Sequence, residues 1–169
     1  KESPQQILEA LPENIAGCAR GKYHAYEGAG LGGSVGYNKD GLTVTVYAYD
    51  LGREQIADGI EDPTVRKAFE NANAELQLAK QAGYYSKVER IEGGIKKATP
   101  GVLVSRYAVI RTRGAEAGIE LFSEIHVFGA RGHVIKFRIS GQKDGEAEFR
   151  KTLDELLPAI HKAITAPAK

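Results

Sequence analysis

Long segments with apolar residues at every second position, joined by short connections, constrain the fold of this chain more than any other feature. Between the expected helices, β-branched and aromatic residues recur at every second position, which is typical of strands. Consecutive strands whose connections are too short for a crossover must pair antiparallel. The expected strands are residues 21–27, 34–38, 42–49, 84–92, 102–112, 119–129 and 133–140. The pattern therefore predicts an antiparallel β-sheet of about six to seven strands.

Three segments carry the signals of amphipathic helices. Ser3 is an expected N-cap that is followed by a proline, and a second start stands at Asp62-Pro63. The last helix should run from about Glu146 to Ile164, with a kink at Pro158 because proline lacks the N–H donor. The fold class is thus α+β, a sheet covered by amphipathic helices as in an α/β/α sandwich. A length of 169 residues fits a single domain over residues 1–169.

Two hairpins allow predictions of register. A type I′ turn at Asp40-Gly41 would place Val35 opposite Val46. In the 119–140 hairpin, the apolar set at 119, 121, 125 and 127 and the set at 135, 137 and 139 are expected to face one core. That requirement predicts a three-residue Ala130-Arg131-Gly132 turn. It also places Glu124 opposite Arg138, and His126 opposite Lys136, on a solvated outer face.

Composition excludes several classes of protein. The chain has 42% hydrophobic residues and 23 Lys+Arg against 22 Asp+Glu, a net charge of +1. These values exclude a chain disordered by charge and a uniformly basic nucleic-acid binder. No apolar run approaches the roughly 18 residues that a membrane helix needs. No nucleic-acid partner and no transmembrane segment are therefore expected.

The single cysteine and the start of the chain bear on its compartment. Cys18 alone cannot form an internal disulfide, and it is expected to be a buried small hydrophobe. The chain starts at Lys1 and contains no Met, which favours a periplasmic or otherwise exported protein whose signal peptide has been removed. A trimmed expression tag would leave the same start.

The order of elements resembles that of the Mog1/PsbP-like α/β/α sandwich proteins. The resemblance is carried by the Gly36-Tyr37 to Val44-Val46-Tyr47 hairpin, by the 119–140 hairpin that ends in Val134-Ile135-Lys136-Phe137-Arg138, and by the helix from Phe149 to Ile164. Members of that group are often exported bacterial or photosystem-associated proteins that act by binding rather than by chemistry, and the resemblance implies such a role here. No site motif of the group is matched, and no functional residue is carried over.

A glycine-rich segment is the sharpest motif. Gly28-Ala29-Gly30-Leu31-Gly32-Gly33 fits the G-x-G-x-x-G pattern of phosphate-binding loops. A dinucleotide site needs a helix that opens at the third glycine, whereas residues 34–38 are expected to form a strand. We therefore expect a flexible connection between two strands, with no nucleotide and no other cofactor.

Catalytic and metal-binding patterns are weak throughout. The four histidines, His24, His126, His133 and His161, include no pair at metal-binding helical spacing. Glu124 and His126 share one strand face, but two ligands would hold a metal poorly, and a solvated face is expected. No G-x-S-x-G elbow supports a serine nucleophile. No catalytic, cofactor-binding or metal-binding residue is predicted.

Charge is distributed unevenly along the chain. Residues 1–85 carry 8 basic and 12 acidic residues, net −4, and residues 86–169 carry 15 basic and 10 acidic, net +5. An anionic protein or ligand surface would fit the basic stretch at 87–113. Its predicted partner-binding residues are Lys87, Arg90, Lys96, Lys97, Arg106, Arg111 and Arg113. The alternative is that strand alternation points these charges at water.

Two functions fit these features of the sequence. The first is an exported, non-enzymatic binding or assembly domain that acts through a sheet face or a loop rim. The alternative is a small-molecule-binding protein or enzyme with a Tyr/Arg/His-lined pocket between sheet and helices. Tyr47 and Tyr49 share a strand face, where their rings could stack on a ligand or simply cover the sheet.

Overall fold

The structure, a computed structural model, consists of one antiparallel sheet with helices on both faces. It describes residues 1–96, 101–112 and 118–166, and only the backbone of residues 92–96. The helices are α1 (Pro4–Glu9), α2 (Pro63–Gln81) and α3 (Glu146–Thr165). The strands are β1 (Asn14–Ile15), β2 (Cys18–Arg20), β3 (His24–Ala25), β4 (Gly33–Asn38), β5 (Leu42–Tyr49), β6 (Tyr85–Lys96), β7 (Val102–Arg111), β8 (Ile119–Ala130) and β9 (His133–Gln142). Their order is β1-β2-β4-β5-β9-β8-β7-β6, and β3 also pairs with β4.

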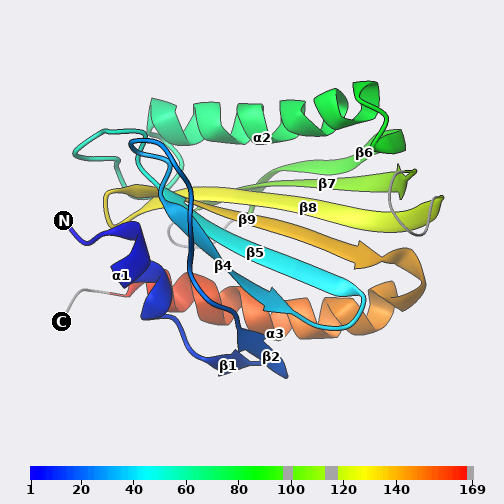
Figure 1. The fold of residues 1–169 in the computed structure, drawn as a ribbon, viewed down its shortest axis with the longest axis horizontal. Coiled ribbons are helices and arrows are strands. Elements are labelled where there is room, and N and C mark those ends of the chain that lie inside the picture. The colour runs from blue at the N-terminus through cyan, green and yellow to red at the C-terminus, as the bar shows by residue number, and fades with distance from the viewer. Residues whose placement is uncertain (97–100, 113–117, 167–169) are drawn as a thin grey trace.

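The layers are those of an α/β/α sandwich. α2 lies over one face of the sheet, and α3 with the short α1 lies under the other (Figure 1). The predicted α+β class and antiparallel sheet are confirmed, with nine strands instead of six to seven. The additional β1 and β2 have only two and three residues, too few for a period of two to be read from the sequence.

Local signals placed the helices correctly. Ser3 forms the expected capping box with Gln6, and the Asp62 side chain accepts a hydrogen bond from Thr64 N–H at 2.8 Å. α3 continues through Pro158 to Thr165. Cys18 is fully buried as expected, and burial raises the pKa of its thiol. Within the described residues, no helix is long and apolar enough to cross a membrane.

The sheet separates two apolar cores. Alternate residues of β8 point to opposite faces, and residues 121–130 are all buried because α2 covers one face and α3 the other. Phe122 and Phe128 pack in the α3-side core, together with every second residue of β5 and β9. Leu121, Ile125 and Val127 pack in the α2-side core.

This division overturns the predicted register of the 119–140 hairpin. Ala130 pairs with His133, so the turn has two residues, Arg131 and Gly132, with φ of 54° and 78°. Two positive φ values are characteristic of a type I′ turn. Glu124 lies opposite Ile139, not Arg138. The prediction was wrong because it assigned both apolar sets to one core, whereas the β8 set packs under α2 and the β9 set over α3.

The β4–β5 hairpin has the predicted register. Val35 pairs with Val46, and Lys39 pairs with Leu42 around the Asp40-Gly41 turn. Of the two turn residues, only Gly41 has a positive φ, at 82°. The turn is therefore not of type I′, which requires a positive φ at both positions.

Candidate functional site: an aromatic pocket beside α2

A cavity of about 780 Å³ opens between the β3–β4 connection, β5 and the first half of α2. Its floor is formed by Tyr47 and Tyr49 of β5 with Lys136 of β9, all half-buried. Tyr26, Leu31 and Leu51 line its rim, with 36%, 45% and 50% of their surfaces exposed. We call this cavity the aromatic pocket.

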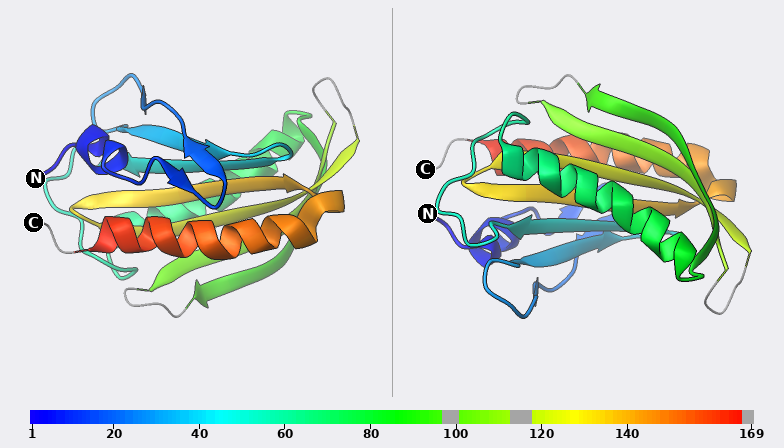
Figure 2. Two further views of the ribbon diagram at one scale, coloured as in Figure 1. Left: turned by 90° about the horizontal axis from the view of Figure 1, so that it is seen from below. Right: turned by 90° about the horizontal axis from the view of Figure 1, so that it is seen from above.

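Strand alternation and the position of α2 create the floor. Val44, Val46 and Ala48 of β5 point into the α3-side core, so Tyr47 and Tyr49 project on the opposite face. α2 packs mainly on β8 and β6. Seen from above in Figure 2, the β4 end of the sheet lies beside this helix rather than beneath it. The two tyrosines are therefore left at the open edge of the α2-side layer.

The glycine-rich segment forms one wall of the pocket. Gly30 C=O accepts hydrogen bonds from Asp50 N–H at 3.3 Å and Leu51 N–H at 2.8 Å. A Cβ on Gly30 would lie 2.3 Å from the Gly52 nitrogen, so only glycine permits this close approach. The segment connects β3 to β4, as predicted for a connection between two strands. Its contact with residues 50–52 brings Leu31 and Leu51 to the same rim.

Aromatic rings and a lysine determine the electrostatics of the floor. Tyr26 stacks on Tyr47 with ring centroids 6.0 Å apart, and Lys136 Nζ lies 4.6 Å from the Tyr47 centroid and 5.6 Å from that of Tyr49. Burial lowers the pKa of Lys136, although the nearby Glu75 carboxylate opposes that effect. Burial, assisted by the charge of Glu75, raises the pKa of Tyr49 to about 12. The tyrosines therefore stay neutral and present π faces to the ammonium.

A second polar cluster lies under the other face of the sheet. Glu124, 1% exposed, has Oε1 at 2.9 Å from His126 Nε2 and at 3.4 Å from Arg106 Nε, and Oε2 bonds to Arg150 of α3. Burial alone would raise the pKa of Glu124, but the His126 hydrogen bond and charge and the Arg150 guanidinium lower it to about 2. The predicted solvated face for Glu124 and His126 was wrong because α3 covers it.

The described part of the predicted basic stretch does not form one patch. Direct cross-strand partners share a face, which puts Lys87 and Arg106 on the α3 side and Arg90 and Arg111 on the α2 side. Lys87 pairs with Glu89 at 3.2 Å, and Arg106 lies beside Glu124. Lys97, Arg113 and the side chain of Lys96 lie outside the described residues. An anionic partner for the 87–113 stretch stays a prediction.

The sequence pointed to part of the aromatic pocket only. The shared face of Tyr47 and Tyr49 was readable from alternation, and the glycine motif marked the wall. Lys136 was missed because the pairing of β5 with β9 brings it opposite Tyr47, and no local pattern reports that pairing. Among the described residues, no group of three or more His, Cys, Asp or Glu side chains could hold a metal ion.

Comparison with known proteins shows which fold the chain has. No protein-family model and no curated protein matches the chain. Among solved structures, the chain is similar to cyanobacterial PsbP (CyanoP) from Synechocystis sp. PCC 6803, with a TM-score of 0.54 and 13% sequence identity over 82% of this chain and 79% of that chain. The chain has a PsbP-like fold. The predicted resemblance is thereby confirmed for the fold.

Proposed function

We propose that this PsbP-like chain is a non-enzymatic binding domain that takes an apolar group of its ligand or partner into the aromatic pocket. One observation carries the proposal. Six large hydrophobic residues are exposed in the described chain, and three of them, Tyr26, Leu31 and Leu51, surround this one cavity. Exposed apolar side chains scattered singly are ordinary, whereas a cluster around a concave site is typical of binding surfaces.

The chemistry of the charged groups supports binding rather than catalysis. Glu124 and His126 would be the natural acid–base pair, but both are buried, and the Glu124 carboxylate already bonds to His126 and Arg150. A general base needs to reach a substrate proton within hydrogen-bond distance. In the aromatic pocket, the raised pKa of Tyr49 opposes formation of a reactive phenolate at neutral pH. Export stays a prediction from the sequence.

Titration with small neutral aromatic molecules tests the proposal. We expect phenol and indole, added to ¹⁵N-labelled protein, to shift amide resonances near Tyr26, Leu31, Tyr47 and Leu51 in a saturable manner. Leu31→Asp should weaken the binding at least about fivefold, because it puts a charge on the apolar rim. Leu78→Asp is the matched control, since Leu78 is 59% exposed on α2 and does not line the pocket.

The same titration can overturn the proposal. Shifts that are absent, that do not saturate, or that gather away from the pocket would contradict it. Equal loss of binding in Leu31→Asp and Leu78→Asp would also contradict it, because the effect would then come from surface charge alone. A thermal melt of both variants checks that each stays folded.

A further inference from the structure

Binding of an apolar group gives no role to Lys136, the charged side chain on the floor of the aromatic pocket. Resting on the proposed function, we infer that the ligand is an organic acid, with a carboxylate that binds Lys136 and an aromatic body that packs among the tyrosines. The inference depends on three features of the pocket: the open donors of the lysine, the balance of charges around it, and the arrangement of the rings.

Among the described residues, the Lys136 ammonium has no ion-pair partner, although the Glu75 carboxylate lies close enough to raise its pKa. β9 pairs with β5 so that Lys136 lies directly opposite Tyr47, and Nζ rests over the faces of Tyr47 and Tyr49. In the part of the chain that the structure describes, Lys136 has these ring contacts but no hydrogen bond or ion pair. A ring face attracts the cation but accepts no full hydrogen bond, so the N–H donors of the ammonium stay available to a carboxylate.

The neighbouring charges favour an anion. Lys136, Lys67 and Arg53 line the pocket, together with the acidic Glu27 and Glu75. Two of these charges are offset by partners outside the pocket lining, since Glu75 pairs with Arg138 at 3.1 Å and Lys67 pairs with Glu70 at 3.8 Å. Lys136 and Arg53 then remain against Glu27. A carboxylate placed at Lys136 therefore meets a net positive surrounding. Because Lys136 is half-buried, water and salt screen that attraction less than at an exposed pair.

The rings favour a flat body close to the charged group. Tyr26 and Tyr47 stack with an interplanar angle of 21°, and the ammonium lies within 6 Å of two ring centroids. An aromatic group bound among these tyrosines would hold a carboxylate near Lys136 Nζ if one or two carbons linked the carboxylate to the ligand's ring. Arylacetic acids have this length, so they are suitable probes.

Isosteric ligands of different charge test the inference. We expect calorimetric titration near neutral pH to show indole-3-acetate binding at least about tenfold more tightly than indole-3-acetamide, with tryptamine weakest. Lys136→Met should reduce the affinity for the acid to that for the amide while leaving the amide unchanged. Lys136→Arg should preserve the preference. The matched control is Lys80→Met, an exposed lysine of α2 that does not line the pocket, which should alter the affinity for the acid less than about twofold.

Each outcome separates this inference from the proposed function. Equal binding of acid and amide, or an unchanged preference in Lys136→Met, would overturn the carboxylate while leaving the apolar pocket intact. Preference for tryptamine would overturn it too. Failure of all three ligands together with phenol and indole would overturn the proposed function itself. A melting temperature of Lys136→Met close to that of the parent chain shows that a lost preference does not come from unfolding.

Discussion

Glu124 Oε1 lies 2.9 Å from His126 Nε2 in the interior between the sheet and α3. Arg150 of α3 and Arg106 of β7 form ion pairs with the same carboxylate. One buried acid of β8 thus connects the neighbouring strand β7 with the C-terminal helix α3. Because Glu124 is 1% exposed, its charge depends on these partners rather than on water.

Removing this charge should destabilise the fold. Glu124→Gln keeps the size of the side chain but leaves His126, Arg106 and Arg150 without their shared anion. We expect the free energy of unfolding to fall by about 2–4 kcal/mol, measured by urea denaturation. Glu146→Gln removes the other carboxylate near Arg150, at 3.5 Å, but the Glu146 side chain is 40% exposed, so the substitution should cost within about 1 kcal/mol. Similar losses in the two variants would contradict a special role for the buried acid.

The same carboxylate should make stability depend on acid pH. The pKa of Glu124 is lowered from its ordinary 4.5 to about 2, so the unfolded chain binds a proton that the folded chain does not. The stabilisation is present above pH 4.5 and is lost as the pH falls toward 2. Between these values Glu124 should contribute a slope of up to about 1.4 kcal/mol per pH unit. Urea denaturation over this range should give a shallower slope for Glu124→Gln, and equal slopes would refute the assignment.

Sequence periodicity predicted most of the elements but not the layer that covers each face. Capping residues and spacing placed α1, α2 and α3, and alternation found the long strands. Register in the β8–β9 hairpin was wrong because Leu121 to Ala130 are buried on both faces, so alternation no longer identifies the core side. The same error made Glu124 and His126 look solvated. Tyr47 and Tyr49 were readable as one face, whereas Lys136 and the Leu31 rim reach them only through long-range pairing.

The glycine wall of the aromatic pocket should tolerate no side chain at Gly30. Gly30 has φ of 78°, and its Cβ would meet the Gly52 nitrogen at 2.3 Å. Gly52 offers a matched control because its φ is 79° and nothing lies within 4 Å of a Cβ there. Both alanine variants should pay for the left-handed conformation, about 1 kcal/mol. Gly30→Ala should lose about 1–3 kcal/mol more because the loop must move. Equal melting temperatures of the two variants would contradict this prediction, because they would show that the loop moves without a loss of stability.

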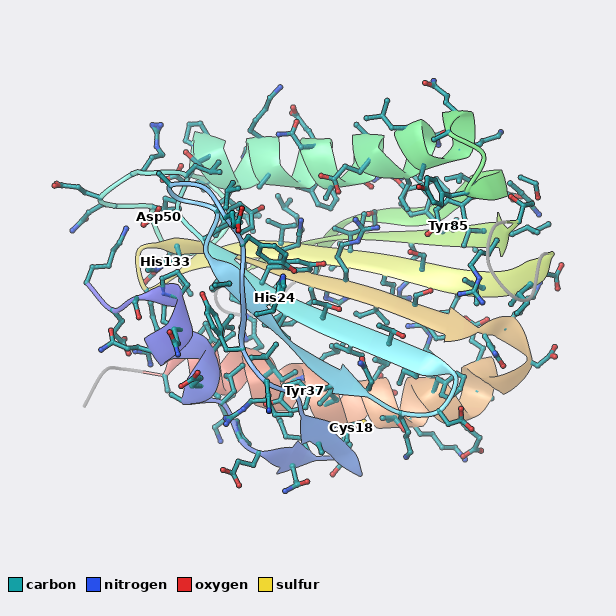
Figure 3. All side chains as sticks on the ribbon, viewed as in Figure 1. Cys18, His24, Tyr37, Asp50, Tyr85 and His133 are labelled. Atoms are coloured by element: carbon teal, nitrogen blue, oxygen red, sulfur yellow. The ribbon has the colours of Figure 1, made fainter. Side chains whose placement is uncertain are left out.

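His133 should make the fold less stable in mild acid. It is fully buried near Asp50 (Figure 3), and its Nδ1–H donates to the Arg131 carbonyl at 2.8 Å. Nε2 has no hydrogen-bond partner and lies 3.8 Å from Asp50 Oδ2, whose carboxylate is already paired with Lys1 at 2.9 Å. Burial lowers the pKa of His133, and Lys1 adds to this effect, whereas the Arg131 carbonyl, Asp50 and Glu2 oppose it.

The unfolded chain therefore takes up a proton at His133 before the folded chain does. Its contribution to stability is complete above the ordinary pKa of 6.5 and declines as the pH falls below that value. His133→Gln should flatten the pH dependence of the unfolding free energy between about pH 6.5 and 5, measured by urea denaturation. His24→Gln is the control, because it removes a histidine that is exposed at the surface. A slope that survives in His133→Gln but disappears in His24→Gln would place the titrating group outside the core.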